Sequence, residues 1–212
     1  MRILCVMIGL AVAVGLASAQ EVGPLPQPLR EGNMERLVLD DGLDRDAAAW
    51  NPAEATVAVD KQHARRGDTA LRLHIDVNWE TGEKNYPVGW PRMNRRFAPA
   101  LHDWSGWDYL DFSIYVTSSR TNLPATPLGV GLYGAANKAD YNRTLSELKL
   151  NQWTDFRLPL SLLPSLNPRT GIQFFIAESN YRHGDVLDFW IDNLSLVRYV
   201  NPTLSASSLG EQ

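Results

Sequence analysis

The sequence is poor in cysteine, and its single cysteine, Cys5, lies at the very start of the 212-residue chain. Without a second cysteine no internal disulfide can form, so the folded part must depend on a hydrophobic core. The 15 glycines and 13 prolines follow no repeating period, which excludes a collagen-like fibre. With 44% apolar residues, the composition also argues against disorder. We therefore expect a globular protein.

Clusters of basic residues are scarce as well. Lys and Arg number 20 against 24 Asp and Glu, which gives a net charge of −4. The basic side chains are dispersed apart from Arg92, Arg95 and Arg96. Binding a phosphate backbone requires clustered lysines and arginines. We therefore expect no nucleic-acid partner.

Sequence motifs for catalysis are also missing. There is no Gly-x-Ser-x-Gly motif, no His-Glu-x-x-His motif and no glycine-rich phosphate loop. The four histidines show no metal-ligand spacing. The motifs therefore give no direct indication of an enzyme.

The one long apolar run lies at the N-terminus. Met1 and Arg2 precede an apolar run at 3–16, and Ala17, Ser18 and Ala19 follow it. This order is typical of a secretory signal peptide. The run is shorter than the roughly 20 residues that span a bilayer. We expect cleavage near Ala19, secretion to the periplasm or the extracellular space, and no membrane anchor.

Composition divides the chain into four parts. Residues 1–19 are the predicted signal peptide, and residues 20–32 carry Pro24, Pro26 and Pro28, which favour an extended linker. Residues 33–200 are the predicted domain, and the serine-rich residues 201–212 are predicted to be a flexible tail. A unit of about 170 residues is the size of a single domain.

Alternation with a period of two dominates the predicted domain. Leu71, Leu73, Ile75 and Val77 alternate with polar residues, and segments 110–116 and 172–176 repeat the pattern. Further strands are predicted at 36–40, 55–60, 87–97, 128–133, 141–150, 153–158 and 187–198, with one helical turn at 44–49. About ten strands with almost no helix predict an all-β antiparallel sandwich.

The segment 79–97 combines aromatic residues with arginines and amides. If 86–97 is a strand, one face carries its even positions, namely Tyr86, Trp90, Arg92, Asn94 and Arg96. The outward positions of two further strand candidates, 128–133 and 172–176, add Tyr133, Gln173 and Phe175 if those strands are neighbours of 86–97. Sugar rings stack on aromatic rings, and their hydroxyls bond to polar side chains, so this mixture suits a glycan. Arginine also favours an acidic sugar. The alternative is that Trp90 is a core residue and the arginines are solvated.

Five segments, in chain order, carry a family resemblance: 37–42 (LVLDDG), 66–73 (RGDTALRL), 104–112 (WSGWDYLDF), 151–160 (NQWTDFRLPL) and 189–196 (FWIDNLSL). Together they resemble the jelly-roll, galactose-binding-like carbohydrate-binding modules of secreted polysaccharide-degrading systems. The resemblance implies jelly-roll topology and reversible, non-catalytic binding of a polysaccharide or oligosaccharide on the concave face. It also implies a polysaccharide-degrading enzyme as a partner.

The resemblance further implies a structural calcium ion. Such modules commonly hold it with an acid of the first strand, carbonyls of the turn before the third strand and an aspartate of the closing strand. These positions correspond to Asp40 or Asp41, to Gly67 with Asp68, and to Asp192. The family usually has Glu where Asp40 stands. The alternative is that Asp40 and Asp41 are turn acids and that Asp192 caps a strand end.

Two other functions stay open. The same fold serves structural or protein-binding domains of the cell surface. A jelly-roll polysaccharide lyase would need a base beside groups that neutralise a uronate. Alginate lyases of this fold carry a Gln-(Ile/Val)-His strand motif, whereas here Gln173 is followed by Phe174 and Phe175.

Overall fold

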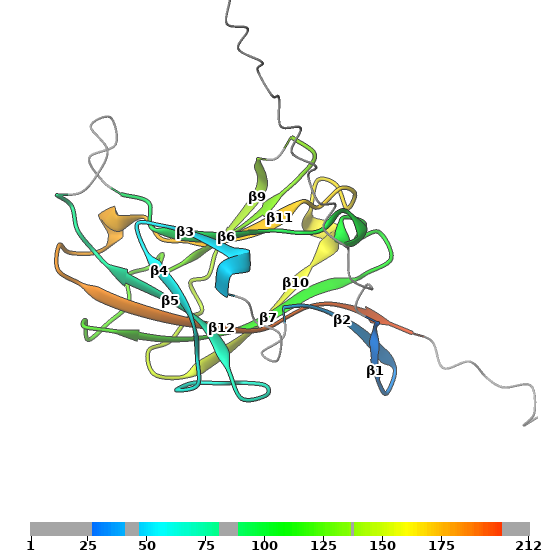
Figure 1. The fold of residues 1–212 in the computed structure, drawn as a ribbon, viewed down its shortest axis with the longest axis horizontal. Coiled ribbons are helices and arrows are strands. Elements are labelled where there is room, and N and C mark those ends of the chain that lie inside the picture. The colour runs from blue at the N-terminus through cyan, green and yellow to red at the C-terminus, as the bar shows by residue number, and fades with distance from the viewer. Residues whose placement is uncertain (1–26, 41–46, 81–88, 137, 201–212) are drawn as a thin grey trace, which may run out of the picture.

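The computed structural model describes residues 27–40, 47–80, 89–136 and 138–200, so the predicted signal peptide and tail lie outside it. Twelve β-strands form two antiparallel sheets in this part of the chain (Figure 1). The other regular elements are four 3-10 helices: η1 (Ala47–Ala49), η2 (Pro99–Leu101), η3 (Leu160–Leu162) and η4 (Glu178–Asn180). The described residues contain no helix long and apolar enough to cross a membrane. The predicted all-β sandwich is confirmed.

One sheet has five strands. In spatial order they are β3 (Trp50–Ala53), β6 (Arg92–Arg96), β11 (Gly171–Phe175), β8 (Gly129–Tyr133) and β9 (Ala139–Thr144). Strands far apart in sequence thus become neighbours, because β11 pairs with β6 on one side and with β8 on the other.

The other sheet has seven strands and is organised around the longest, β12 (Val186–Tyr199). One edge of β12 pairs with β5 along its first half and with β2 along its second half, while β7 pairs along the other edge. The remaining strands extend the sheet outward. Its other members are β1 (Leu29–Glu31), β2 (Met34–Asp40), β4 (Thr56–Asp60), β5 (Ala70–Asp76), β7 (Tyr109–Ser118) and β10 (Trp153–Pro159).

The hydrophobic core lies between the two sheets. Alternation places Leu71, Leu73 and Ile75 of β5 in it, each almost fully buried. Phe112 of β7 meets Phe174 of β11 edge-on from the opposite sheet, with ring centroids 5.6 Å apart. The strands with period-two patterns therefore bury the faces that the sequence predicts.

Four strands differ clearly from the prediction. β1 falls within the predicted linker and pairs with β2. The two strands form a hairpin whose two-residue turn contains Gly32, at φ +63°, a conformation that glycine adopts readily. β9 ends at Thr144 although a strand was predicted as far as residue 150. β6 begins only at Arg92. The short strand β3 was not predicted.

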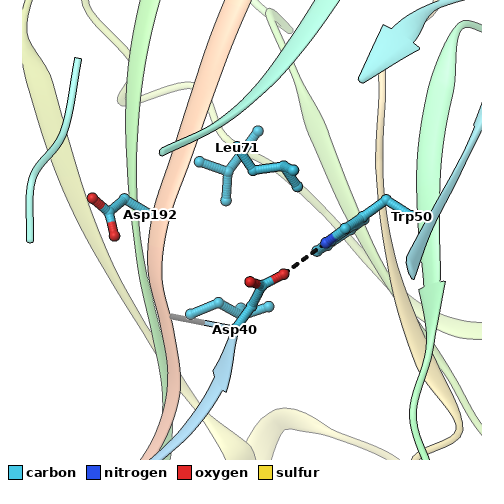
Figure 2. A pocket seen from close by; sticks show the side chains of 6 residues that line it. Asp40, Trp50, Leu71 and Asp192 are labelled. Carbon is cyan, nitrogen blue, oxygen red and sulfur yellow. Dashed lines mark hydrogen bonds between the residues drawn. The ribbon is translucent and has the colours of Figure 1, made fainter. Parts of the chain in front are cut away.

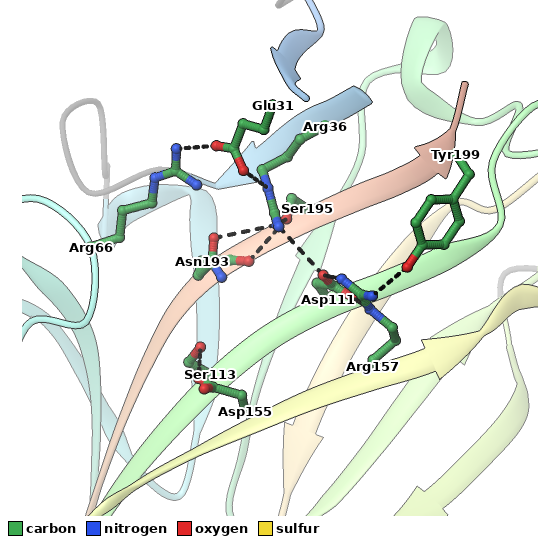
Figure 3. A network of polar contacts seen from close by, with 10 residues as sticks. All are labelled: Glu31, Arg36, Arg66, Asp111, Ser113, Asp155, Arg157, Asn193, Ser195 and Tyr199. Carbon is green, nitrogen blue, oxygen red and sulfur yellow. Dashed lines mark hydrogen bonds and ion pairs between the residues drawn. The ribbon is translucent and has the colours of Figure 1, made fainter. Parts of the chain in front are cut away.

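An ion-pair network covers part of the outer face of the seven-stranded sheet (Figure 3). The buried carboxylate of Asp111 accepts two hydrogen bonds from Arg157, at 2.9 and 2.7 Å, and lies 3.5 Å from Arg36. The hydrogen bond to Asp111 raises the pKa of the Arg157 guanidinium further above its ordinary value. Arg36 also donates to Ser195 over 2.5 Å. This network links β2, β7, β10 and β12.

Candidate functional site

Strand register sets out the outer face of the five-stranded sheet in rows. Because side chains alternate along each strand, the residues opposite the core meet their equivalents on the neighbouring strands. The first row is Ala53, Arg92, Phe175, Gly129 and Thr144; the second is Asn51, Asn94, Gln173, Gly131 and Asn142; the third is Arg96, Gly171, Tyr133 and Ala139. We call these three rows the row face.

The row face brings together six of the eight residues predicted to bind a glycan. They are Arg92, Asn94, Arg96, Tyr133, Gln173 and Phe175. The seventh, Trp90, lies two residues before β6 and packs against Phe175. The eighth, Tyr86, lies outside the described residues. Neighbouring strands, which the sequence left undetermined, therefore place this group on one surface.

Two glycines of β8 make room on the row face for side chains of the neighbouring strand β11. A Cβ atom at Gly129 would lie 2.4 Å from the ring of Phe175, and one at Gly131 would lie 2.6 Å from Nε2 of Gln173. The side chains of β11 therefore lie across β8 where any larger residue would collide with them. The signal in the sequence is a pair of glycines spaced by two within a predicted strand.

Tyr133 is held by two neighbours. Its hydroxyl donates to Oε1 of Gln173 over 2.7 Å, and the Arg96 guanidinium carbon stands 4.0 Å from its ring centroid. Gln173 is only 4% exposed, so it supports Tyr133 and has little surface of its own to offer a ligand. Beside it, Asn94 donates to the carbonyl of Asn51 over 3.2 Å.

Trp90 is the most exposed large aromatic residue at this face. The residue as a whole is 48% exposed. The ring meets Phe175 edge-on at a centroid distance of 5.3 Å. Arg92 donates to the Trp90 carbonyl over 3.0 Å, and its guanidinium carbon lies 5.7 Å from the Trp90 ring centroid. Trp90 is therefore not a core residue, which excludes the alternative interpretation for this position.

Two carboxylates fix the backbone that carries Trp90. Oε2 of Glu54 accepts from the Trp90 N–H over 2.7 Å, and Oε2 of Glu178 accepts from the Gly89 N–H over 2.9 Å. The other oxygen of Glu178 accepts from the N–H of Asn78 over 3.1 Å. A Cβ at Gly89 would lie 2.5 Å from each carboxylate, which leaves room only for glycine. We call Glu54 and Glu178 the acid clamp.

The acid clamp was missed by sequence reasoning. Neither Glu54 nor Glu178 is among the residues that the sequence predicts to bind a ligand. Glu54 has a positive φ of 54°, a backbone conformation that is unusual for a residue with a side chain. The sequence around Glu54 and Glu178 does not mark either of them as part of a site. Their hydrogen bonds reach residues that are 36 and 89 positions away in the chain.

The residues that the resemblance assigns to calcium lie partly together. Asp40 and Asp192 line one small pocket, but in Figure 2 the carboxylate of Asp192 points away from Asp40. Asp192 accepts from the backbone N–H groups of Arg65 and Arg66, at 2.7 and 2.9 Å, in the turn that continues to the exposed pair Gly67 and Asp68.

Asp40 accepts hydrogen bonds from an indole N–H and from an arginine. Its Oδ2 accepts from Trp50 Nε1 and from Arg95 Nη1, each at 2.6 Å. Asp41 lies outside the described residues. Over the described ranges, no group of three or more His, Cys, Asp or Glu side chains is placed to hold a metal ion. The described side chains alone do not form a calcium site, and calcium stays a prediction of the resemblance.

Comparisons with known proteins give a fold and no family membership. No protein-family model matches the chain, and no curated protein matches it. Among solved structures, the family 11 carbohydrate-binding module from Clostridium thermocellum, in complex with a β-1,3-1,4-mixed-linked tetrasaccharide, has a TM-score of 0.51 at 14% identity. The match covers 78% of this chain and 97% of that module.

Two enzymes match over a part of their length. An exo-β-agarase has a TM-score of 0.53 at 11% identity, over 78% of this chain and 25% of the enzyme. The β-1,2-glucanase from Parabacteroides distasonis has a TM-score of 0.50 at 12% identity, over 69% of this chain and 21% of the enzyme. At such identities the likeness concerns the fold. The chain has the jelly-roll β-sandwich fold of carbohydrate-binding modules.

Proposed function

We propose that the row face binds a glycan reversibly, with Trp90 as its main aromatic contact. The observation that carries the proposal is the exposure of Trp90, 48%, at the border of a sheet face that carries amides, arginines and aromatic rings. A solvent-exposed indole offers an apolar surface on which the C–H face of a sugar ring can stack. The flanking amides supply donors and acceptors for hydroxyl groups.

The residues divide the task between contact and support. Trp90 and Arg92 border the face where β6 begins, while Asn94 and Arg96 continue along the same strand. Gln173 and the acid clamp act from behind, since they hold Tyr133 and Trp90 through hydrogen bonds. Tyr86 joins this proposal from the sequence alone. A ligand would therefore meet a surface whose rings are already positioned before binding.

The structural comparisons support the proposal by analogy. The Clostridium thermocellum module was solved with an oligosaccharide bound to it, and two of the matching proteins are enzymes named for polysaccharide substrates. The matches cover 25% and 21% of those enzymes, so the likeness concerns one part of each. We propose that this chain is secreted, acts without catalysis and works beside a polysaccharide-degrading enzyme.

A combined binding and product assay tests this function. The purified protein is applied to a glycan array and to insoluble polysaccharides, and the soluble fraction of each tube is assayed for new sugar products. We expect retention on at least one glycan with no products. Unsaturated products would instead establish a lyase. Retention on no glycan would contradict the proposal and leave a structural or protein-binding domain.

A further inference from the structure

The row face carries its charge in two arginines of one strand. Arg92 and Arg96 are four residues apart on β6 and point to the same side, with Asn94 between them. At about 3.3 Å per residue, their backbone positions are separated by about 13 Å. Two guanidinium groups therefore lie along one line on the face proposed to bind a glycan, so the inference below rests on the proposed function.

The one acidic residue in the five strands of this sheet, Asp140 of β9, alternates with Asn142 and Thr144 and is paired with Arg169. The three rows contain neither Asp nor Glu. Three carboxylates lie near the margins, and each has a partner within the protein. Glu54 accepts from the Trp90 N–H, Glu178 is buried between backbone amides, and Asp140 forms two hydrogen bonds with the fully buried Arg169.

The surroundings of Arg92 differ from those of most arginines in the molecule. Within the described ranges, Arg92 contacts the carbonyl and the ring of Trp90 and forms no ion pair with a carboxylate. Ten other arginines do form such pairs: Arg36, Arg65, Arg66, Arg72, Arg95, Arg120, Arg143, Arg157, Arg169 and Arg198. Among the described residues of a chain with a net charge of −4, Arg92 is thus an arginine without a carboxylate partner.

We infer that the ligand of the row face is an anionic glycan whose carboxylate or sulfate groups pair with Arg92 and Arg96. A guanidinium presents parallel N–H donors that match the oxygens of either group, and such charge-assisted bonds are stronger than bonds to hydroxyls. Trp90 then supplies stacking, and the asparagines of the second row bind the neutral hydroxyls between charged groups. A wholly neutral glycan would leave the guanidinium of Arg92 without a matching group.

Affinity measurements on matched polymers test this inference. The probes are polygalacturonate, its methyl-esterified form, which has the same backbone without charge, and a sulfated galactan. We expect the protein to bind at least one charged polymer and to bind the methyl ester at least about tenfold more weakly. Binding should weaken as salt is added, because exposed charge pairs are screened. The carboxylated and sulfated polymers show which acidic group is recognised.

Matched variants separate the role of Arg92 from net charge. Arg92→Gln should lose about tenfold in affinity for the charged polymer, whereas Arg92→Lys should lose less because it keeps the charge without the planar fork. Arg30→Gln is the control, since it removes the same charge from an exposed residue of β1 in the other sheet. Melting temperatures confirm that all three variants fold.

The outcomes distinguish this inference from the proposed function. Equal binding of neutral and charged polymers, unaffected by Arg92→Gln, would overturn the anionic ligand and leave glycan binding intact. Equal losses in Arg92→Gln and Arg30→Gln would show that only net charge matters, which also overturns it. Absence of binding to every glycan would overturn both. Selective loss in Arg92→Gln, for a charged polymer that the protein prefers, supports the inference.

Discussion

The carboxylate of Glu178 accepts a hydrogen bond from the Gly89 N–H over 2.9 Å, and this bond fixes the residue that precedes Trp90. Glu178 is 3% exposed and comes from the 3-10 helix that follows β11, so a buried charge of one segment orients another. This bond and the bond from the Trp90 N–H to Glu54 fix the position of the backbone that carries the exposed indole. The proposed binding surface therefore depends on residues that lie behind it.

Glu178→Gln tests the acid clamp. The amide keeps one acceptor oxygen for two N–H donors, those of Gly89 and Asn78, and turns an NH2 group toward the other. We expect the free energy of unfolding to fall by about 1–3 kcal/mol and glycan retention to weaken. Urea denaturation measures the first effect. Glu147→Gln, at an exposed pair with Arg143, is the control and should change stability by less than about 1 kcal/mol. Unchanged stability in Glu178→Gln would contradict the clamp.

Asp111→Asn tests the network on the seven-stranded sheet. The change removes the carboxylate that pairs with both Arg157 and the largely buried Arg36. Because a buried arginine then loses a countercharge, we expect a loss of about 3–5 kcal/mol in the free energy of unfolding. Asp155→Asn, whose exposed carboxylate pairs with Arg65, should cost only about 0–1 kcal/mol. Similar losses in the two variants would show that burial of the network does not matter.

Tyr181 gives the fold a dependence on alkaline pH. Burial raises the pKa of the Tyr181 hydroxyl above its ordinary value of 10.0, and the hydroxyl donates to the carbonyl of Pro127 over 2.6 Å. Above about pH 10 the unfolded chain loses this proton while the folded chain keeps it. The stability that Tyr181 contributes is therefore complete below that pH and declines as the pH rises. Chemical denaturation at about pH 9 and pH 11 measures the decline, and Tyr181→Phe should make it shallower. An identical slope in that variant would contradict the assignment.

The calcium that the resemblance implies has a separate test. A metal bound only by the folded state stabilises it by mass action, so the hypothesis predicts that EDTA lowers the melting temperature and that added calcium restores it. Asp192→Asn should remove this response if the aspartate is a ligand. A melting temperature that changes with neither EDTA nor calcium would contradict the metal hypothesis. The ion pair between Arg95 and Asp40 would then be the contact that connects β6 to β2 here.

The period of two predicted much of the fold but not which strands are neighbours. Alternation identifies the buried face of β11 because Ile172 and Phe174 are apolar, yet it carries no information about which strand lies beside it. The pairing of β11 with β6 and β8 joins segments that are distant in the chain. The set Arg92, Gln173 and Tyr133 was therefore predictable as outward residues and not as one surface.

Features of the site that depend on single hydrogen bonds between distant residues could not be predicted from the sequence. Glu54 and Glu178 are ordinary acids in loops until the fold brings them to Gly89 and Trp90. Predicted residues also take different parts in the structure. Gln173, expected to touch the ligand, is buried beneath its neighbours, whereas Trp90 is as exposed as a contact residue requires.

Retention of a glycan by Trp90→Ala tests the central claim most directly. The polymer retained most strongly by the unchanged protein is the probe, and retention and melting temperature are measured on the same samples. Because Trp90 is 48% exposed, we expect loss of retention with a nearly unchanged melting temperature. Tyr199→Ala, which removes a 50% exposed aromatic ring from the seven-stranded sheet, should retain the glycan. Full retention by Trp90→Ala, or equal loss in both variants, would contradict glycan binding at the row face.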